Sequence, residues 1–440
     1  MRCFVVVNYF AKGHKDFQLR NKNETDLYYK ITYMRITYAI IALLLLVTQD
    51  SFAQSTARKY PVTESQASAV VQKALKVSPV IDGHNDLFAW YFGCDYKRLK
   101  KCPQDIADYP LDTISKGQTD IPRWRKGGVG GVLLNVFADS LNDYLDAYDL
   151  LYRLEKAYPK DLKVVATAAD MRTSMKAGKI TLLPMLEGSV RLENKPSLLR
   201  SFYKLGLRCV TFAYKTNGLA DGSDDAPKHN GISSLGKEMV AEMNRLGVLI
   251  DMSHISAKSM NDILDITKAP VIFSHSNARA LCDVNRNVSD DVLKRLKENN
   301  GIIMLTMVPE FTTNAIKNWM NTGDEVYYKA KKDFPGNRDT VNTIIRKWEK
   351  DNIPPAVTVT DIADHFDYVK KLIGVDYIGI SGDYDGLSFT IKGMEDVSCY
   401  PKLLVELAKR GWTEVELRKI SGENFLRVFD EVERKAAALN

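Results

Sequence analysis

The sequence predicts an α/β protein whose main part is one (β/α)8 barrel with long helical insertions. Three observations lead to this prediction: eight short apolar runs, amphipathic stretches between them, and acidic or histidine residues where several runs end. Buried parallel strands read as continuous apolar runs, and their alternation with helices is typical of a parallel sheet. Because a barrel gathers the carboxyl ends of its strands on one face, polar residues at those ends would converge there.

The expected strands and helices follow one another along most of the chain. The strands are residues 80–83, 131–137, 180–186, 209–213, 248–252, 271–273, 301–307 and 377–380. Helical spacing of apolar residues is found at 67–76, 144–158, 198–205, 235–246, 256–266, 290–299, 359–373, 413–418 and 424–435. A doubly wound open sheet is the alternative. It usually has fewer strands, and no glycine-rich phosphate-binding fingerprint follows the first run.

Two connections exceed the usual length of barrel loops. Residues 138–179 hold the helix at 144–158 and a small unit at 163–176. Residues 309–358 hold many charges and, among them, Trp319, Tyr327, Tyr328, Phe334 and Trp348. The second connection is expected to be helical and to lie on the surface. Insertions at this end of a barrel commonly shape substrate access, and a packing appendage is the alternative.

The N-terminal residues have the pattern of a targeting segment and are not expected to be part of the folded domain. A basic residue, an apolar run at 40–47 and the small residues of Ser51-Phe52-Ala53 predict a signal peptide over 34–53. Residues 1–33 then form an upstream extension that is not native, and 54–440 form one barrel domain with its insertion at 309–358. We expect a secreted or periplasmic protein with no stable membrane span after cleavage, since a span needs roughly 20 apolar residues. An uncleaved anchor is the alternative.

Charge and cysteines narrow the choice of partners. The formal net charge is +6 with no lysine- or arginine-rich run, which argues against nucleic acid and for a small substrate. The six cysteines include none with the C-x-x-C spacing of a zinc or redox site. Cys94 and Cys102 flank a polar loop and could close a small ring in an exported protein. The cysteines are expected to be structural.

Five residues at run ends have the chemistry of metal ligands. His84 and Asp86 are two apart after the first run, so an extended chain points both the same way. Glu187 ends the third run, and its two oxygens could bridge two ions. His254 and His275 follow neighbouring runs, and neutral imidazoles are preferred zinc ligands. The alternatives are a turn hydrogen bond for His84, a salt bridge for Glu187 and core packing for the other histidines.

Two further residues suit catalysis or substrate binding beside such a centre. Asp383, in Gly382-Asp383-Tyr384-Asp385-Gly386, could take a proton from water and give it to a leaving amine. An ordinary acidic turn or part of a calcium loop is the alternative. Arg286 follows His275 in the same connection and could bind a carboxylate through two bonds. The alternative is a surface arginine without a role.

These residues, in this order, resemble the renal (membrane) dipeptidase family of binuclear zinc peptidases. The resemblance spans about residues 77–437. Its matching segments are 81–86, 119–122, 127–131, 186–188, 243–247, 251–254, 270–276, 286–288, 382–386 and 395–397. It implies a distorted (β/α)8 TIM-like barrel of the amidohydrolase type, in an exported protein like the bacterial members.

The resemblance also implies a ligand set. His84, Asp86 and Glu187 would hold one zinc ion, and Glu187, His254 and His275 would hold a second, with Glu187 as the bridge. The expected cofactor is therefore two zinc ions per chain, and a metal-bridging hydroxide would attack the peptide carbon.

Substrate roles follow from the same resemblance. Arg286 would bind the free carboxylate of a dipeptide, and Asp383 would carry the proton. The family accepts D-residues at the C-terminal position, so L,D-dipeptides are among the expected substrates. The oligomeric state, for which a homodimer is one choice, is left open.

One position departs from the family pattern. Tyr214 stands near the place where many members carry a histidine that contacts the substrate. A phenol donates a hydrogen bond to a developing oxyanion but cannot carry the charge of an imidazolium. Tyr214 is therefore predicted to bind substrate, with a changed rate or selectivity. A related metal-dependent amide or lactone hydrolase, and a binding protein with reduced turnover, are the alternative functions.

Overall fold

Eight parallel strands close into a barrel in the described part of the chain. The computed structural model describes residues 61–93, 102–103, 105–136, 140–387 and 389–440. The barrel strands are β1 (Val80–Asn85), β2 (Val129–Asn135), β4 (Ile180–Glu187), β5 (Cys209–Thr211), β6 (Leu249–Asp251), β7 (Ile272–Phe273), β8 (Ile302–Thr306) and β9 (Ile378–Ser381). β1 pairs with both β2 and β9, and β2 pairs with β4, so the sheet has closed on itself. All eight predicted strands are confirmed, and the open sheet is wrong.

A short additional strand distorts the wall of the barrel. β3 (Leu162–Val164) pairs with the first residues of β4, whereas β5 pairs with its last residues, Met185 to Glu187. The early part of β4 therefore borders β3 instead of the next barrel strand. The sequence placed only a small unit of unspecified structure here, because three residues with alternating exposure carry no clear strand signal.

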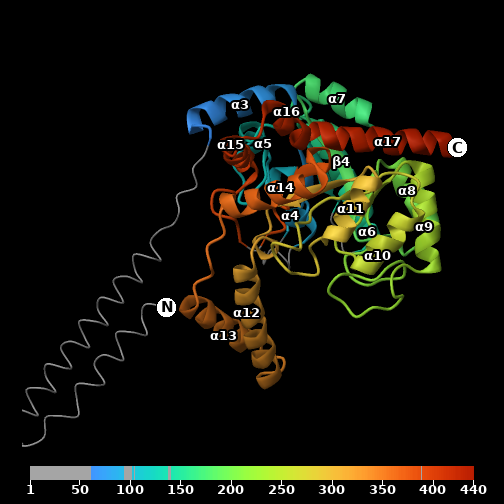
Figure 1. Cartoon of the computed structure of the whole chain (residues 1–440). Coiled ribbons are helices and arrows are strands. Elements are labelled where there is room, and N and C mark those ends of the chain that lie inside the picture. Colours follow the sequence, from blue (N-terminus) through green and yellow to red (C-terminus); the bar gives the residue numbers. More distant parts are fainter. Residues whose placement is uncertain (1–60, 94–101, 104, 137–139, 388) are drawn as a thin grey trace, which may run out of the picture. The chain divides into compact units, whose positions relative to one another are not determined.

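Helices surround the barrel as the alternating pattern predicts (Figure 1). They are α3 (Glu64–Val77), α4 (Ala89–Phe92), α5 (Ile121–Lys126), α6 (Leu141–Ala157), α7 (Ala168–Lys176), α8 (Pro196–Lys204), α9 (Ser234–Leu246), α10 (Ala257–Ile266), α11 (Asp290–Glu298), α14 (Val359–Ile373), α15 (Tyr400–Lys409), α16 (Glu414–Arg418) and α17 (Asn424–Leu439). Every helix expected from periodicity is present, and α4, α5, α7 and α15 were not among the expected helices.

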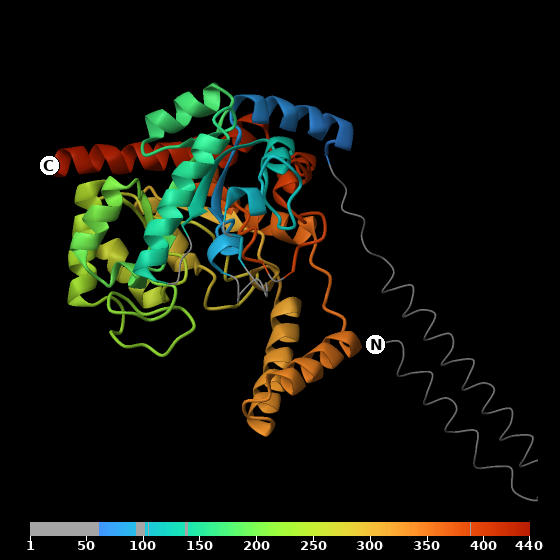
Figure 2. The ribbon, with the colours of Figure 1, turned by 180° about the vertical axis from the view of Figure 1, so that it is seen from behind.

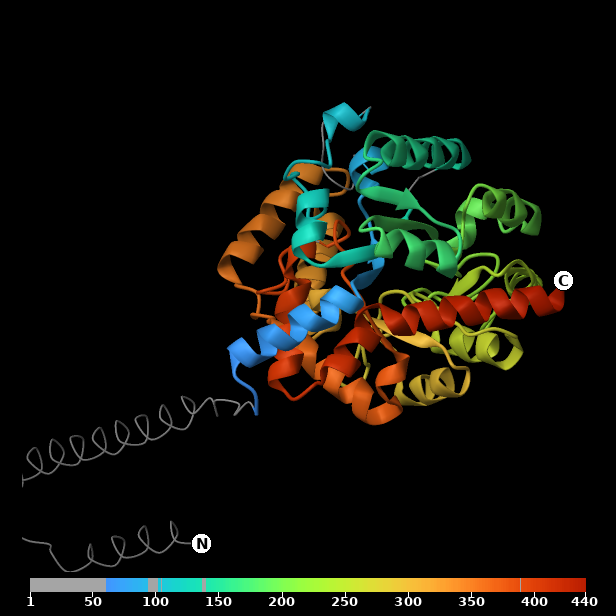
Figure 3. The same cartoon turned by 90° about the horizontal axis from the view of Figure 1, so that it is seen from above.

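The core of the barrel is closed by the last helix. Ile81, Leu133 and Ile302 from three strands share one buried cluster with Phe425 and Phe429 of α17. Figure 3 shows α17 lying across this end of the barrel. Because the early residues of the strands are covered here, their carboxyl ends at the opposite face are left to form a site.

The insertion at 309–358 forms a helical hairpin, as expected. α12 (Asn314–Asp333) and α13 (Arg338–Asp351) pack on each other and project from the barrel in two opposite views (Figure 1 and Figure 2). The ring centroids of Trp319 and Trp348 lie 5.0 Å apart, and the Trp319 indole donates to the carbonyl of Asn352 at 2.9 Å. The predicted aromatic residues therefore join the two helices near the base of the hairpin.

Several predictions concern residues outside the described ranges. The proposed upstream extension, the signal peptide and Cys94 are among them. Cys102 is disulfide-bonded, and Cys209, Cys282 and Cys399 are buried free thiols. No helix in the described ranges is both long and apolar enough to cross a lipid bilayer.

Candidate metal centre

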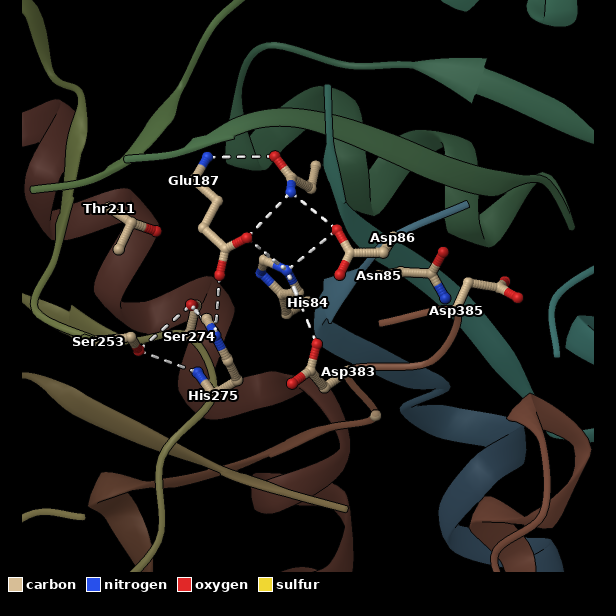
Figure 4. Close-up of polar contacts among 12 residues, drawn as sticks. His84, Asn85, Asp86, Glu187, Thr211, Ser253, Ser274, His275, Asp383 and Asp385 are labelled. Carbon is tan, nitrogen blue, oxygen red and sulfur yellow. Dashed lines mark hydrogen bonds and ion pairs between the residues drawn. The ribbon is translucent and has the colours of Figure 1, made fainter. Parts of the chain in front are cut away.

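Acidic and imidazole side chains converge where the barrel strands end (Figure 4). β1 supplies His84 and is followed directly by Asp86, and β4 ends on Glu187. His254, His275 and Asp383 follow β6, β7 and β9 within three residues. All five predicted ligands and the predicted proton carrier therefore meet at one face, as the strand-end rule requires.

Glu187 faces three imidazoles with its two carboxylate oxygens. Its Oε1 is 2.9 Å from Nε2 of His254 and 3.3 Å from Nε2 of His275. Its Oε2 lies 3.9 Å from Nε2 of His84, whose ring centroid is 4.1 Å from that of His275. The two oxygens of one carboxylate thus face different groups of ligand atoms, which is the arrangement expected of a bridging ligand.

The second group of ligand atoms surrounds His84. Its Nε2 is 3.5 Å from Oδ1 of Asp86 and 3.9 Å from Oδ1 of Asp383. His84 is completely buried, and neither ring nitrogen has a hydrogen-bond partner among the described residues. An unpartnered buried polar group is costly, so an imidazole facing carboxylates fits a site built for a cation.

Among the residues that the structure describes, two sets of three have ligand atoms close enough to share an ion. His84, Glu187 and His275 form one set, and His84, Asp86 and Asp383 form the other, each with atoms within 4.8 Å of one another. Imidazole nitrogen and carboxylate oxygen are common ligands of zinc and of related divalent ions. The donor set therefore fits divalent metal.

The pKa values follow from burial and mutual charge. Burial opposes ionisation of Glu187, but His84, His254 and His275 lower its pKa well below the usual range. Burial also works against a charged His84, yet Glu187 and Asp86 raise the pKa of this imidazole to about 10. The carboxylates thus favour positive charge at this point of the barrel.

Burial has the opposite effect on Asp383. It raises the pKa of this carboxyl well above the usual range, with Asp86 and Glu187 adding to the rise against the opposing effect of His84. A carboxyl group with a raised pKa holds a proton more readily than an exposed aspartate does.

Asn135 is a site residue that the sequence reasoning missed. Its Nδ2 donates to Oδ1 of Asp86 at 2.8 Å and to Oε2 of Glu187 at 3.3 Å. Its Oδ1 accepts from the backbone N–H of Glu187 at 3.1 Å. One amide therefore separates and orients two carboxylates. A signal was present, because Asn135 ends the apolar run of β2 as Glu187 ends that of β4.

Strained backbone occurs at the same face. His254, Asp383 and Asp385 have φ values of 70°, 53° and 66°, in the left-handed region. Each such residue costs roughly 1–3 kcal/mol and persists where its surroundings enforce it. The Asp383 N–H donates to the carbonyl of His84 at 3.1 Å, and Asp385 Oδ1 accepts from the Trp90 indole at 2.8 Å. Asp385 thus anchors the turn, while Asp383 faces the imidazole of His84.

Arg286 is buried beside the centre, so the alternative of a surface arginine is wrong. It donates to Ser276 Oγ at 2.6 Å and to the carbonyl of His275 at 2.7 Å. Its Nε has no hydrogen-bond partner among the described residues, and its guanidinium lies 5.3 Å from the ring centroid of Phe311. This arginine therefore keeps one unpaired N–H, buried next to the candidate histidine ligands.

Tyr214 lies at the exposed edge of the centre. Its ring centroid is 4.5 Å from that of His254, and half of the residue is exposed. Partial burial and the carboxylates of Glu187, Asp383 and Asp86 raise its pKa to about 12. The phenol is therefore protonated at neutral pH and able to donate.

The remaining described histidines lie in other settings. His365 is buried in α14, where Nε2 meets the carbonyl of Thr312 at 2.9 Å and Nδ1 accepts from the Ala278 N–H at 3.2 Å. His229 Nε2 meets the carbonyl of Asn217 at 2.8 Å in a loop. Neither belongs to a group of candidate metal ligands among the described residues.

Comparison with known proteins gives consistent matches over most of the chain. A family model described as membrane dipeptidase (peptidase family M19) matches residues 68–440. The dipeptidase aclJ of Aspergillus oryzae is 32% identical over 386 residues, covering 84% of this chain and 82% of its own. The dipeptidase tcpJ of Claviceps purpurea is 34% identical over 377 residues, covering 81% of this chain and 78% of its own.

Solved structures share the fold at lower identity. The probable dipeptidase PvdM of Pseudomonas aeruginosa has a TM-score of 0.73 and 23% identity, covering 86% of this chain and 100% of its own. A metallo peptidase of Rhodobacter sphaeroides, liganded with a phosphinate mimic of L-Ala-D-Ala, has a TM-score of 0.65 and 22% identity. That match covers 81% of this chain and 99% of the other.

Proposed function

Because the chain belongs to the membrane dipeptidase family, peptidase family M19, and is a metal-dependent dipeptidase, we propose that it uses two zinc ions. We propose further that its substrates are dipeptides, L,D-dipeptides among them. The observation that carries the proposal is the position of Glu187. Its Oε1 faces His254 and His275, and its Oε2 faces His84. One carboxylate can therefore serve two ions at once.

The ligands divide into two groups around that bridge. His84 and Asp86 would join Glu187 on one side, and His254 and His275 would join it on the other. Bound zinc supplies the chemistry of acidifying a water molecule and polarising the scissile carbonyl. Asn135 would keep the carboxylates of Asp86 and Glu187 oriented for this purpose, since it donates to both.

Asp383 is proposed to move the proton. Its raised pKa suits a group that takes up a proton at the reacting centre and then delivers it to the nitrogen of the leaving amine. The turn that begins at Gly382 fixes its position, because the N–H of Gly382 donates to the buried Asp82 at 2.8 Å. A carboxyl that carries a proton must stay near the scissile bond throughout the reaction.

Arg286 and Tyr214 are proposed to bind the substrate. A guanidinium with an unpartnered Nε can donate to the free carboxylate of a dipeptide. The Tyr214 phenol, protonated at neutral pH, would donate to the developing oxyanion. The phosphinate mimic of L-Ala-D-Ala bound by the Rhodobacter sphaeroides peptidase supports a dipeptide of that class as substrate.

Export is also part of the proposal. The pattern at residues 34–53 predicts a signal peptide that ends near Ala53. N-terminal sequencing of the protein recovered outside the cytoplasm should find a start close to residue 54. A protein that begins at Met1 and stays in the cytoplasm would contradict this.

Metal analysis combined with a dipeptide library tests the function. The wild type should hold two zinc ions and hydrolyse dipeptides, with the library showing whether L,D pairs are preferred. Glu187→Gln should lose both metal and activity, and Glu298→Gln, at an exposed position of α11, should keep both. Full dipeptidase activity in metal-free Glu187→Gln protein would contradict the proposal.

A further inference from the structure

A fully buried carboxylate lies behind the histidine ligands. Asp251 ends β6 and is 0% exposed. Its Oδ1 accepts the backbone N–H groups of Ser253 at 3.0 Å and Ser274 at 2.8 Å. Its Oδ2 accepts the hydroxyls of Ser274 at 2.6 Å and Thr211 at 2.5 Å. One carboxylate thus joins the ends of β5, β6 and β7.

The contacts of Asp251 continue to a proposed metal ligand. Ser274 Oγ lies 2.6 Å from Nδ1 of His275, whose Nε2 faces Oε1 of Glu187 at 3.3 Å. Figure 4 shows Ser253 and Ser274 beside His275, on the side away from Asp383. The imidazole is therefore held at one nitrogen while the other is presented to the centre.

The chemistry of these groups fixes the direction of the hydrogen bonds. An ionised carboxylate only accepts, so Ser274 gives its single hydroxyl hydrogen to Asp251. The Ser274 oxygen can then only accept from His275, which places the imidazole hydrogen on Nδ1. Nε2, which lies 2.9 Å from Nε2 of His254, is left with a lone pair and no hydrogen, which is the form of histidine that binds a metal ion.

We propose that Asp251 is a positioning residue for the metal centre, acting through the Ser274 hydroxyl to fix the tautomer and orientation of His275. The inference rests on the proposed metal function and adds residues to which no role has been assigned. Asp251 also accepts from the N–H of Ser253, so the same carboxylate holds the turn that places His254.

Two substitutions break the chain of hydrogen bonds in different ways. Ser274→Ala removes the link and leaves the carboxylate. Asp251→Asn can supply an amide donor to Ser274, which turns the serine hydroxyl toward Nδ1 and moves the imidazole hydrogen to Nε2. Because both act on the same nitrogen, the double variant should bind metal no more weakly than the worse single variant.

The measurement is zinc affinity by competition with a chelator, together with the visible spectrum of the cobalt(II)-loaded protein. Each single variant should lose roughly 10–100-fold in affinity for one of the two ions. The ligand-field bands of cobalt should change as well. The matched control is Ser259→Ala, because Ser259 is equally buried and donates to the carbonyls of Asp221 and Gly231, away from His275.

The outcomes separate the positioning role from general destabilisation and from the proposed function. Weaker zinc binding and changed cobalt bands in folded Ser274→Ala, with neither change in Ser259→Ala, support the inference. Wild-type affinity and spectrum in folded Ser274→Ala overturn it, whether or not Asp251→Asn folds. A wild type that binds no divalent metal overturns the proposed function and the positioning role together.

Discussion

The buried histidine of α14 gives a prediction whose size follows from its contacts. His365 is neutral in the folded protein, because Nε2–H donates to the carbonyl of Thr312 while Nδ1 accepts from the Ala278 N–H. Protonating Nδ1 would break the hydrogen bond that it accepts from Ala278 and would place a positive charge in the core. Burial accordingly lowers the pKa of His365 from 6.5 to about 4, although the carbonyl of Thr312 and the carboxylates of Asp364 and Asp361 favour the charged form.

The sign of the pH dependence follows from this depressed pKa. Between pH 4 and 6.5 the unfolded chain binds more protons at this residue than the folded chain does. The contribution of His365 to stability is therefore complete above pH 6.5 and is lost as the pH falls toward 4. A shift of this size corresponds to roughly 3 kcal/mol.

The assay is urea unfolding of the wild type and of His365→Gln across this pH range. Glutamine does not titrate, so the other ionisable groups cancel in the difference between the two proteins. The wild type should lose roughly 3 kcal/mol more than the variant on acidification. Curves that stay parallel across the range would refute the assignment of His365 as a buried neutral donor and acceptor.

Three further predictions concern the centre itself. Asn135→Leu should weaken zinc binding roughly 10–100-fold, measured by chelator competition, because Asp86 and Glu187 lose a shared donor; unchanged affinity would contradict this. Arg286→Met should raise KM for dipeptides roughly tenfold to a hundredfold and abolish the preference of the enzyme for dipeptides over dipeptide amides. If that preference is preserved, another group binds the free carboxylate of the substrate. Tyr214→Phe should lower kcat roughly a hundredfold with little change in KM, and an unaltered kcat would remove the phenol from the oxyanion site.

The sequence predicted the barrel because its strands are buried on both faces. Such strands read as unbroken apolar runs, and the polar residue that ends each run is conspicuous, as for Glu187 and His275. The same rule predicted Asp383 beside these residues, because it follows the run of β9. Barrel closure then followed from the number of runs, since eight alternating strands and helices are more than an open sheet usually has.

Other features depend on contacts that no local pattern encodes. β3 (Leu162–Val164) is too short and too exposed to be distinguished from a loop. Asn135 was overlooked because an amide is not a typical zinc ligand, and its role is to donate to ligands. The Asp251 contacts join residues from three separate strand ends, so only the register of the barrel brings them together.

Diffraction from crystals of the zinc-loaded protein, collected at the zinc absorption edge, tests the central claim most directly. Anomalous density should show two ions on opposite sides of the Glu187 carboxylate, one near His84 and Asp86 and one near His254 and His275. A single ion, or ions that leave Glu187 uncoordinated, would contradict the bridging role on which the proposed function depends.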